Sequence, residues 1–295
     1  MKAAVLPNLD KRGSEELVEK LGKYLKECGI TPYLPDSIHC GDYICVPDDE
    51  LFETADVIIT IGGDGTIIRH AKRAAEYSKP ILGINAGRMG YLANIEQDEY
   101  KLIKNLASGN YTIENRMMLE VEVREHGTIS EKFYALNDAV ITGGFISRII
   151  DITATVSGDS IGYRADGLVI ATPTGSTAYS MSAGGPIIDP DMNCVCITPI
   201  CSFALASKPI IVSADKPMIF RANSKKRIEI FLTVDGRKSA CIKPQTEVVI
   251  HKSDKFVKLI RLNERSFYKT LSVKFFEQGG AVRERKQIGK NTSNN

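Results

Sequence analysis

Ile59-Thr60-Ile61-Gly62-Gly63-Asp64-Gly65-Thr66 runs from an apolar segment directly into a helical pattern. The continuous apolar run at residues 56–61 is typical of a strand that is buried on both faces of a parallel sheet. Three glycines in four positions permit a tight turn and let backbone N–H groups approach a phosphate, and the N-terminus of the next helix favours negative charge. The segment therefore predicts a strand–turn–helix unit that binds phosphate.

Asp64 is an unexpected residue in such a turn, because a carboxylate among anion-binding amides repels a phosphate. It has a purpose if it accepts a proton from a hydroxyl group or helps to hold Mg²⁺ beside the phosphates. The alternative is an ordinary tight turn in which Asp64 caps the helix. The chain contains neither a G-x-x-x-x-G-K-[ST] loop nor a G-x-G-x-x-G fingerprint, so an ordinary P-loop or Rossmann cofactor site is not supported.

The organisation of the chain changes near residue 111. Before it, short β-branched runs alternate with helical patterns, which predicts βαβ units around a parallel sheet. Ser14 is expected to cap the first helix, and Gly29 follows its end. After residue 111, short β-rich runs separated by Gly, Ser, Asp or Pro predict a mainly β domain. The expected strands are 2–6, 56–61, 80–84, 118–123, 133–142, 149–156, 210–212, 227–234 and 247–251, and the expected helices are 14–28, 65–77, 98–106 and 264–278.

A second unusual segment extends from Thr172 to Ser182. It places six Ser or Thr residues and Tyr179 within eleven positions, behind an apolar run and ahead of Gly184-Gly185-Pro186. Small hydroxyl side chains leave space for a flat ligand and offer donors and acceptors to ribose and base edges. The alternative interpretation is a surface loop rich in Ser and Thr.

Composition excludes several classes of protein. The 295 residues are enough for about two domains, and 38 Lys and Arg against 36 Asp and Glu give a net charge of +2. That balance argues against a nucleic-acid-binding arm. We find no apolar run of the roughly 18 residues that a membrane span needs and no signal peptide, so we expect a cytoplasmic protein. The seven cysteines contain no C-x-x-C pair and are expected to be reduced, mostly buried side chains.

The four histidines show no spacing typical of a metal site. A zinc site or a Ser–His–Asp triad is therefore not supported, and we expect no protein-bound metal. Any Mg²⁺ is expected to arrive with a nucleotide, because phosphates usually supply most of its ligands.

Several motifs, in this order along most of the chain, resemble those of the NAD kinase family. The most specific is Thr172-Pro173-Thr174-Gly175-Ser176-Thr177-Ala178-Tyr179, whereas the Gly-Gly-Asp-Gly-Thr turn also occurs in lipid kinases and phosphofructokinases. The other motifs are Asn85-Ala86-Gly87-Arg88-Met89-Gly90-Tyr91-Leu92, Asn137-Asp138, the block from Asp166-Gly167 to Pro186, and Val234-Asp235-Gly236.

The resemblance implies a fold in two parts and a phosphoryl-transfer activity. We expect a Rossmann-like α/β domain at residues 1–110, completed by residues 264–280, a β-rich NAD-binding domain at 111–263, and a flexible tail at 281–295. The last helix is expected to return to the first domain. The implied reaction moves a phosphoryl group from ATP or polyphosphate to the 2′-hydroxyl of the adenosine ribose of NAD, giving NADP. A homodimer or homotetramer is also implied.

The resemblance further assigns roles to individual residues. Asp64 corresponds to the proton acceptor, and Asn137 with Asp138 corresponds to a pair that contacts the dinucleotide. Arg164 resembles the residue of enzymes that prefer NAD to NADH. The remaining residues expected to bind substrate or nucleotide are Gly62, Gly63, Gly65, Thr66, Arg69, Arg148, Asp166, Thr177, Ala178, Tyr179, Ser180, Met181, Ser182 and Arg237.

Two segments depart from the family's pattern, and two other functions stay open. Cys201-Ser202-Phe203-Ala204-Leu205 stands where many members have Pro-His-Ser/Thr-Leu, and Arg237 stands where Gln is common. A lipid kinase of the diacylglycerol or sphingosine type shares the turn but needs an apolar acyl-chain groove. A non-catalytic NAD(P)-binding sensor shares the pocket but has little use for Asp64.

Overall fold

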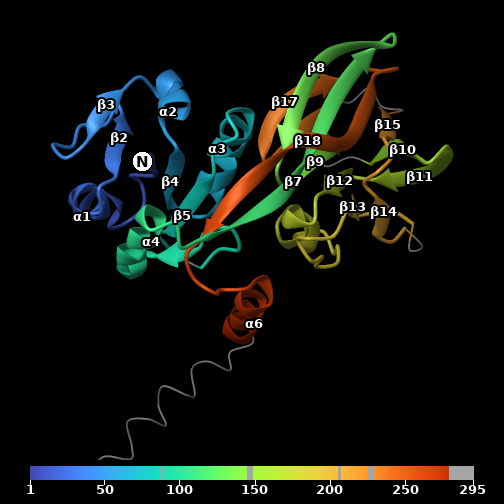
Figure 1. Ribbon diagram of the computed structural model, residues 1–295. Coiled ribbons are helices and arrows are strands. Elements are labelled where there is room, and N and C mark those ends of the chain that lie inside the picture. The colour runs from blue at the N-terminus through green and yellow to red at the C-terminus, as the bar shows by residue number, and fades with distance from the viewer. Residues whose placement is uncertain (88, 145–148, 205–206, 225–228, 279–295) are drawn as a thin grey trace, which may run out of the picture. The chain divides into compact units, whose positions relative to one another are not determined.

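The computed structural model describes residues 1–87, 89–144, 149–204, 207–224 and 229–278 (Figure 1). Arg148 therefore lies outside the described residues. The chain divides into two compact units. Of the described residues, the first comprises 1–67, 79–114 and 259–278, and the second comprises those within 68–78 and 115–258.

The first unit is built around a parallel sheet in the order β3-β2-β1-β4-β5, with β6 parallel to β5 (Figure 1). All six residues of β4 are buried, as expected for an apolar strand in the middle of such a sheet. The last part of β18 (Glu247–Arg261) joins this unit, where Leu259 pairs in parallel with Ile81. The strands are β1 (Lys2–Pro7), β2 (Thr31–Pro35), β3 (Ile44–Val46), β4 (Val57–Gly62), β5 (Ile81–Asn85) and β6 (Ile95–Glu96).

Helices of the first unit follow the strands. The helix α1 (Ser14–Glu27) turns Leu17, Leu21 and Leu25 toward the core, where they are buried with apolar residues of β1 and β4. The helix α6 returns to this unit, as expected, and Phe267 packs against Tyr91 with 5.9 Å between the ring centroids. The other helical elements are α2 (Asp48–Thr54), α3 (Asp64–Glu76), which begins here, the 3₁₀ helix η1 (Gln97–Ile103), α4 (Lys104–Ala107) and α6 (Phe267–Gln278).

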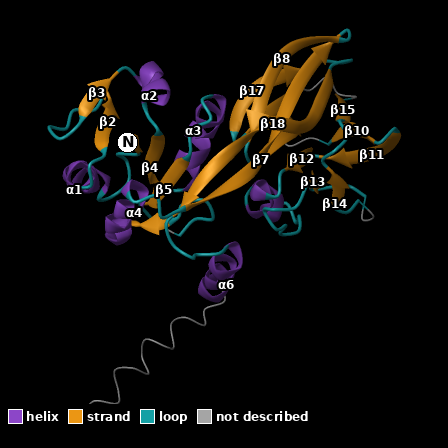
Figure 2. Cartoon of the chain, viewed as in Figure 1, coloured by secondary structure: helices purple, strands orange, loops and turns teal. Residues whose placement is uncertain are grey.

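The second unit is rich in antiparallel strands (Figure 2). One sheet has the order β14-β13-β12-β9-β16-β17, and a second group runs β11-β10-β15-β18, with β7 paired to β18 and β8. Apolar side chains from both groups, such as Ile141, Ile152 and Phe220, share one buried core. The strands are β7 (Thr112–Glu125), β8 (Thr128–Ala135), β9 (Asp138–Gly143), β10 (Ile150–Val156), β11 (Asp159–Ala165), β12 (Gly167–Ala171), β13 (Cys194–Ile200), β14 (Ile210–Ser213), β15 (Met218–Asn223), β16 (Ile230–Val234), β17 (Arg237–Ile242) and β18 (Glu247–Arg261).

The structure corrects two expectations about α1 and the segment before β7. Ser14 does not cap α1: Gly13 occupies the cap position with φ 80°, so Ser14 is already helical and its buried hydroxyl has no hydrogen-bond partner among the described residues. The helix expected at 98–106 is mostly the 3₁₀ turn η1, whose capping box joins Glu96 and Glu99, and only Lys104–Ala107 is α-helical.

The cysteines are free as expected, but most are not buried. Cys194 and Cys196 lie inside the second unit, whereas Cys45, Cys201 and Cys241 are exposed. Burial depends on which face of a strand or turn reaches the core, and a scattered set of cysteines gives no periodic signal of that face.

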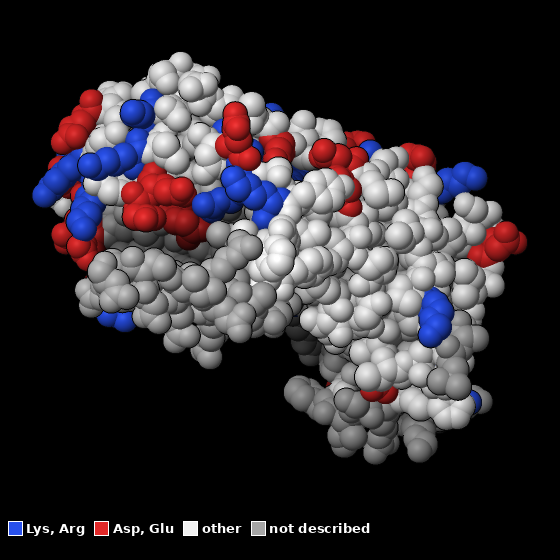
Figure 3. All heavy atoms as spheres, turned by 90° about the horizontal axis from the view of Figure 1, so that it is seen from below, with Lys and Arg blue, Asp and Glu red and all other residues white. Residues whose placement is uncertain are grey.

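The charged side chains are of both signs. Where they gather on the face shown in Figure 3, Lys and Arg lie beside Asp and Glu. In the part of the chain that the structure describes, no helix is long and apolar enough to cross a membrane.

Candidate active site

The Gly-rich turn joins β4 to α3 in the first unit. A Cβ atom on Gly62 would lie 2.1 Å from Thr66 Oγ1, so the close return of the helix requires glycine there. Gly63 and Gly65 face open space, and the Thr66 N–H donates to the Gly63 carbonyl at 2.9 Å. The backbone thus takes the expected strand–turn–helix form, while phosphate binding by the turn stays a prediction.

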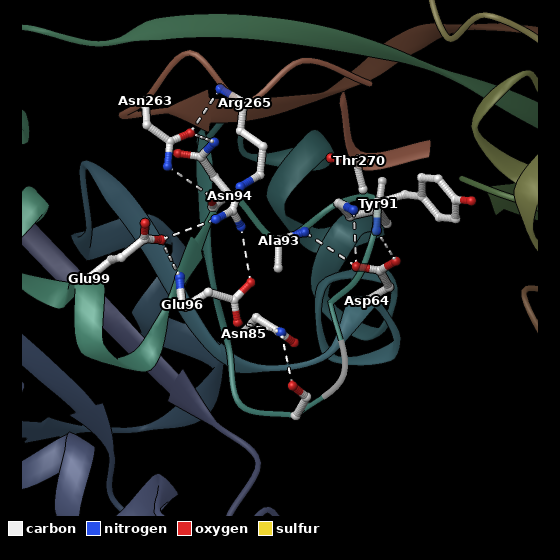
Figure 4. A network of polar contacts seen from close by, with 12 residues as sticks. Asp64, Asn85, Tyr91, Ala93, Asn94, Glu96, Glu99, Asn263, Arg265 and Thr270 are labelled. Atoms are coloured by element: carbon white, nitrogen blue, oxygen red, sulfur yellow. Dashed lines mark hydrogen bonds and ion pairs between the residues drawn. The ribbon is translucent and has the colours of Figure 1, made fainter. Parts of the chain in front are cut away.

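The carboxylate of Asp64 is held by the segment that follows β5. Its Oδ2 accepts the Tyr91 N–H at 2.7 Å, and its Oδ1 accepts the N–H groups of Leu92 at 3.0 Å and Ala93 at 3.3 Å (Figure 4). A carboxylate offers about four acceptor positions, so these three bonds leave one for a ligand. A Cβ atom on Gly90 would stand 2.0 Å from Asp64 Oδ1, so glycine alone leaves room for this carboxylate.

A cavity of about 460 Å³ lies in the second unit. Its size falls within the range of small-molecule sites. It brings together four of the predicted residues, Asn137, Asp138, Ala178 and Tyr179. Its other lining residues are Val140, Thr142, Thr233, Asp235 and Gly236. Two larger hollows in the described part of the chain, of about 710 and 570 Å³, are lined by none of the predicted site residues.

Asp235 lines this cavity and holds the backbone of two other lining residues, Asn137 and Asp138. With φ of 47° at Asp235 and 76° at Gly236, these two residues form the turn between β16 and β17, as Asp-Gly pairs commonly do in hairpins. Its carboxylate accepts the N–H groups of Leu136 and Asn137 at 2.8 Å each and that of Asp138 at 3.2 Å. Asp235 therefore fixes the backbone that carries the Asn137-Asp138 pair.

Two carboxyl groups consequently share one buried region. Burial first, and then the negative charge of Asp235, raise the pKa of Asp138 to about 7. Burial also raises the pKa of Asp235, but its three backbone donors and Arg237 oppose that shift. Because the donors favour a charged Asp235, Asp138 is the group that retains a proton near neutral pH.

The hydroxyl-rich segment forms two short turns, η2 (Thr174–Thr177) and α5 (Tyr179–Ser182). Several of its hydroxyls serve the interior of the unit. The buried Ser180 hydroxyl lies 3.0 Å from that of Thr198, and the Thr172 hydroxyl donates to the Leu136 carbonyl at 2.6 Å. The Ser180 side chain is thus used for packing rather than presented to the cavity, while Tyr179 is 44% exposed.

The structure does not bring every predicted residue to the cavity. Arg164 is exposed on β11, 4.0 Å from Asp151, with its guanidinium 5.5 Å from the Phe203 ring centroid. Arg69 is exposed in α3, and Arg237 is exposed at the start of β17. The other predicted residues outside its lining are Gly62, Gly63, Asp64, Gly65 and Thr66 of the turn, Asp166, Thr177, Met181 and Ser182.

One cluster of metal-ligand types lies elsewhere in the second unit. Among the described residues, Glu120, Glu122 and His251 place one ligand atom each within 4.8 Å of one another. The Lys132 ammonium already lies 2.5 Å from Glu120 and 3.5 Å from Glu122, and Arg124 pairs with Glu122 at 2.5 Å, so two cationic side chains neutralise the two carboxylates. Glu120 and Glu122 lie on the same face of β7, and His251 comes from the neighbouring strand β18, so sequence spacing alone does not reveal the third member.

Sequence reasoning overlooked two sets of residues. It assigned no role to Asp235 or to the amides of residues 91–93, although both occur in motifs that were recognised. The Asp235-Gly236 pair predicts a hairpin turn, and Gly90 is typical of a place where another group approaches the backbone closely. Neither pattern indicates which group that is.

A parallel-sheet unit that carries a Gly-Gly-Asp-Gly turn, together with a second unit of antiparallel strands, is the architecture expected of a kinase of this kind. Family models cover most of the chain: residues 4–111 match the ATP-NAD kinase N-terminal domain and residues 136–262 match the ATP-NAD kinase C-terminal domain. The chain belongs to the NAD kinase family.

Individual relatives agree with that assignment. An NAD kinase of Natranaerobius thermophilus is 39% identical over 278 residues, covering 92% of this chain and 96% of the relative. The crystal structure of an NAD kinase from Archaeoglobus fulgidus in complex with ATP has a TM-score of 0.71 at 26% identity, covering 93% and 98% of the two chains. The yeast NADH kinase structure with NADH, at 20% identity, shares the fold with a TM-score of 0.80 and covers 100% of this chain and 89% of its own.

Proposed function

We propose that this enzyme transfers the γ-phosphoryl group of ATP to the 2′-hydroxyl of the adenosine ribose of NAD, with Asp64 as the proton acceptor. The 2′-oxygen forms a bond to the γ-phosphorus while the bond to the bridging oxygen of ADP breaks, and the hydroxyl proton passes to Asp64. The observation that carries the proposal is the Asp64 carboxylate, fixed by three backbone donors beside the Gly-rich turn with one acceptor position left.

The fixed carboxylate suits phosphoryl transfer. The transition state of this reaction is loose, so catalysis depends on positioning and on charge more than on covalent chemistry. A base that is already oriented loses little freedom when the hydroxyl arrives. A sensor that only binds a nucleotide gains nothing from a carboxylate held beside phosphate groups.

We assign the cavity of the second unit to part of NAD. An amide such as that of Asn137 reads a base or carboxamide edge, and a carboxylate such as that of Asp138 accepts hydrogen bonds from ribose hydroxyls. These polar groups disfavour an acyl chain, which weighs against a lipid kinase.

A divalent cation is expected to accompany ATP and to neutralise charge on its phosphates. The donors near the turn fit this arrangement better than a protein-bound metal, because three positions of Asp64 are taken by backbone N–H groups and phosphates are the usual main ligands of Mg²⁺.

The test is an assay with NAD, ATP and Mg²⁺ in which an NADP-specific dehydrogenase detects the product. Parallel reactions replace ATP with polyphosphate and NAD with NADH. Asp64→Asn is expected to lower kcat by at least ~10²-fold while calorimetry still detects NAD binding. Asp98→Asn, which alters an exposed carboxylate of the same unit, is the matched control and should keep the normal rate.

Asp64→Asn also has a structural cost that the experiment must separate from chemistry. An amide keeps one oxygen acceptor, so its NH₂ group faces at least one of the three backbone donors. Thermal unfolding and NAD affinity are therefore measured on the same samples. A full rate in folded Asp64→Asn would remove Asp64 as the base.

A further inference from the structure

The end of β18 and the segment that follows it contact the same stretch of chain that holds Asp64. Arg261, the last residue of β18, donates from Nη1 to the Leu92 carbonyl at 3.0 Å and from Nη2 to Glu114 at 2.8 Å. It is only 8% exposed. The Leu92–Ala93 peptide group therefore touches a buried guanidinium through its C=O and Asp64 through its N–H.

The two contacts act on one peptide group from opposite ends. A charged donor on a carbonyl polarises the amide, which makes its N–H a stronger donor, and hydrogen bonds in such chains reinforce one another. The Ala93 N–H bond to Asp64 Oδ1 is the longest of the three, at 3.3 Å. It is thus the bond that depends most on the peptide being held in place.

Neighbouring contacts fix this stretch on both sides of the peptide. Asn94 accepts the Leu262 N–H at 2.7 Å through its side chain and exchanges hydrogen bonds with Asn263 at 3.0 and 3.3 Å (Figure 4). The Tyr91 ring packs on Phe267, and the Lys274 ammonium lies 4.2 Å from its centroid. Residues 91–94 therefore cannot shift without disturbing the end of β18 and the helix α6.

We propose that Arg261 is a positioning residue for phosphoryl transfer, which acts on Asp64 through the Leu92–Ala93 peptide group. It touches no reacting atom. Its contribution is to keep the backbone donors, and through them the carboxylate, in a fixed orientation. This inference rests on the proposed role of Asp64 as the base.

The experiment is a double-mutant cycle in the NADP assay with Arg261→Met, Asp64→Asn and the combined variant. We expect Arg261→Met to lower kcat about tenfold with the KM for NAD within twofold. In the Asp64→Asn background the same change should lower kcat less than twofold, because the carboxylate that it positions is gone.

Arg265→Gln is the matched control. Arg265 belongs to the same segment and pairs with Glu96 at 3.0 Å and Glu99 at 3.6 Å, and within the described part of the chain its hydrogen bonds and ion pairs do not reach residues 91–93. Its loss should lower the unfolding temperature and leave kcat within twofold. Equal losses of kcat in Arg261→Met and Arg265→Gln would indicate general loosening and overturn the inference.

A second substitution covers the case in which Arg261→Met does not fold. Arg261→Lys keeps the charge and loses the fork that contacts two partners at once, and we expect about a threefold loss of kcat that again disappears when residue 64 is Asn. The same loss in both backgrounds, or none, would contradict the positioning role alone. A full rate in Asp64→Asn would instead contradict the proposed base.

Discussion

Gly90→Ala is the sharpest test of how Asp64 is held. The added Cβ atom would stand 2.0 Å from Oδ1, 2.5 Å from Cγ and 2.8 Å from Oδ2 of Asp64, whereas real Cβ contacts essentially never fall below 3.0 Å. The carboxylate must therefore move by about 1 Å or rotate away from the amides of residues 91–93. A misplacement of about 1 Å in an active site costs up to ~10² in rate.

The fold should survive this substitution. The atoms in the way are the end of a flexible side chain, and Gly90 is not in the left-handed region of φ, so alanine fits its backbone. Losing one hydrogen bond to a charged group costs about 1.5–3 kcal/mol, which lowers the unfolding temperature of a domain of this size by several degrees. We expect kcat to fall about 100-fold while the protein remains folded at 25 °C.

The assay is NADP formation with thermal unfolding measured on the same preparations. Gly87→Ala is the control, because it lies in the same loop and its added Cβ meets nothing within 4 Å. It should keep kcat within twofold. Normal turnover by Gly90→Ala would show that the observed carboxylate position is unnecessary, and the role proposed for Asp64 would have to be withdrawn.

Four further predictions concern the cavity of the second unit. In Asp235→Asn an NH₂ group faces at least one of the three backbone donors, so the backbone of Asn137 and Asp138 loses support. The KM for NAD should then rise at least ~10-fold with a smaller change in kcat. Steady-state kinetics that show an unchanged KM would contradict this. Burial and the charge of Asp235 raise the pKa of Asp138 to about 7. NAD binding should therefore tighten as the pH rises through 7 and Asp138 becomes a charged acceptor. Without the charge of Asp235, in Asp235→Asn, calorimetry should find the midpoint of this pH dependence at a lower pH. The same shift means that the folded state binds the Asp138 proton more tightly than the unfolded chain. The contribution of Asp138 to the free energy of unfolding should therefore fall between about pH 4 and 7, a slope that denaturant titrations should find missing in Asp138→Asn. In Gly175→Ala the new Cβ would lie 2.1 Å from the Asn137 carbonyl oxygen, whereas in the control Gly162→Ala it meets nothing within 4 Å. Only Gly175→Ala should therefore lose NAD affinity, together with about 1–3 kcal/mol of stability.

Local patterns predicted the frame of the molecule. The apolar run of β4 and the glycines that follow it predicted a buried strand and a tight turn before α3. The spacing of the leucines predicted the buried face of α1. The prediction that Ser14 caps α1 was wrong. Gly13 and Ser14 are both reasonable N-cap residues, and the choice between them depends on how the preceding loop approaches the helix.

The sequence by itself determined the parts that depend on neighbouring residues: strand, turn, helix, and a carboxylate placed among glycines. Tertiary structure decided what holds that carboxylate. Its donors are backbone amides 27 to 29 positions away, and Arg261 reaches the Leu92 carbonyl across 169 positions. Every residue except proline carries such an N–H and every residue a C=O. The groups that orient Asp64 therefore leave no distinctive letter in the sequence, and only the folded chain selects them.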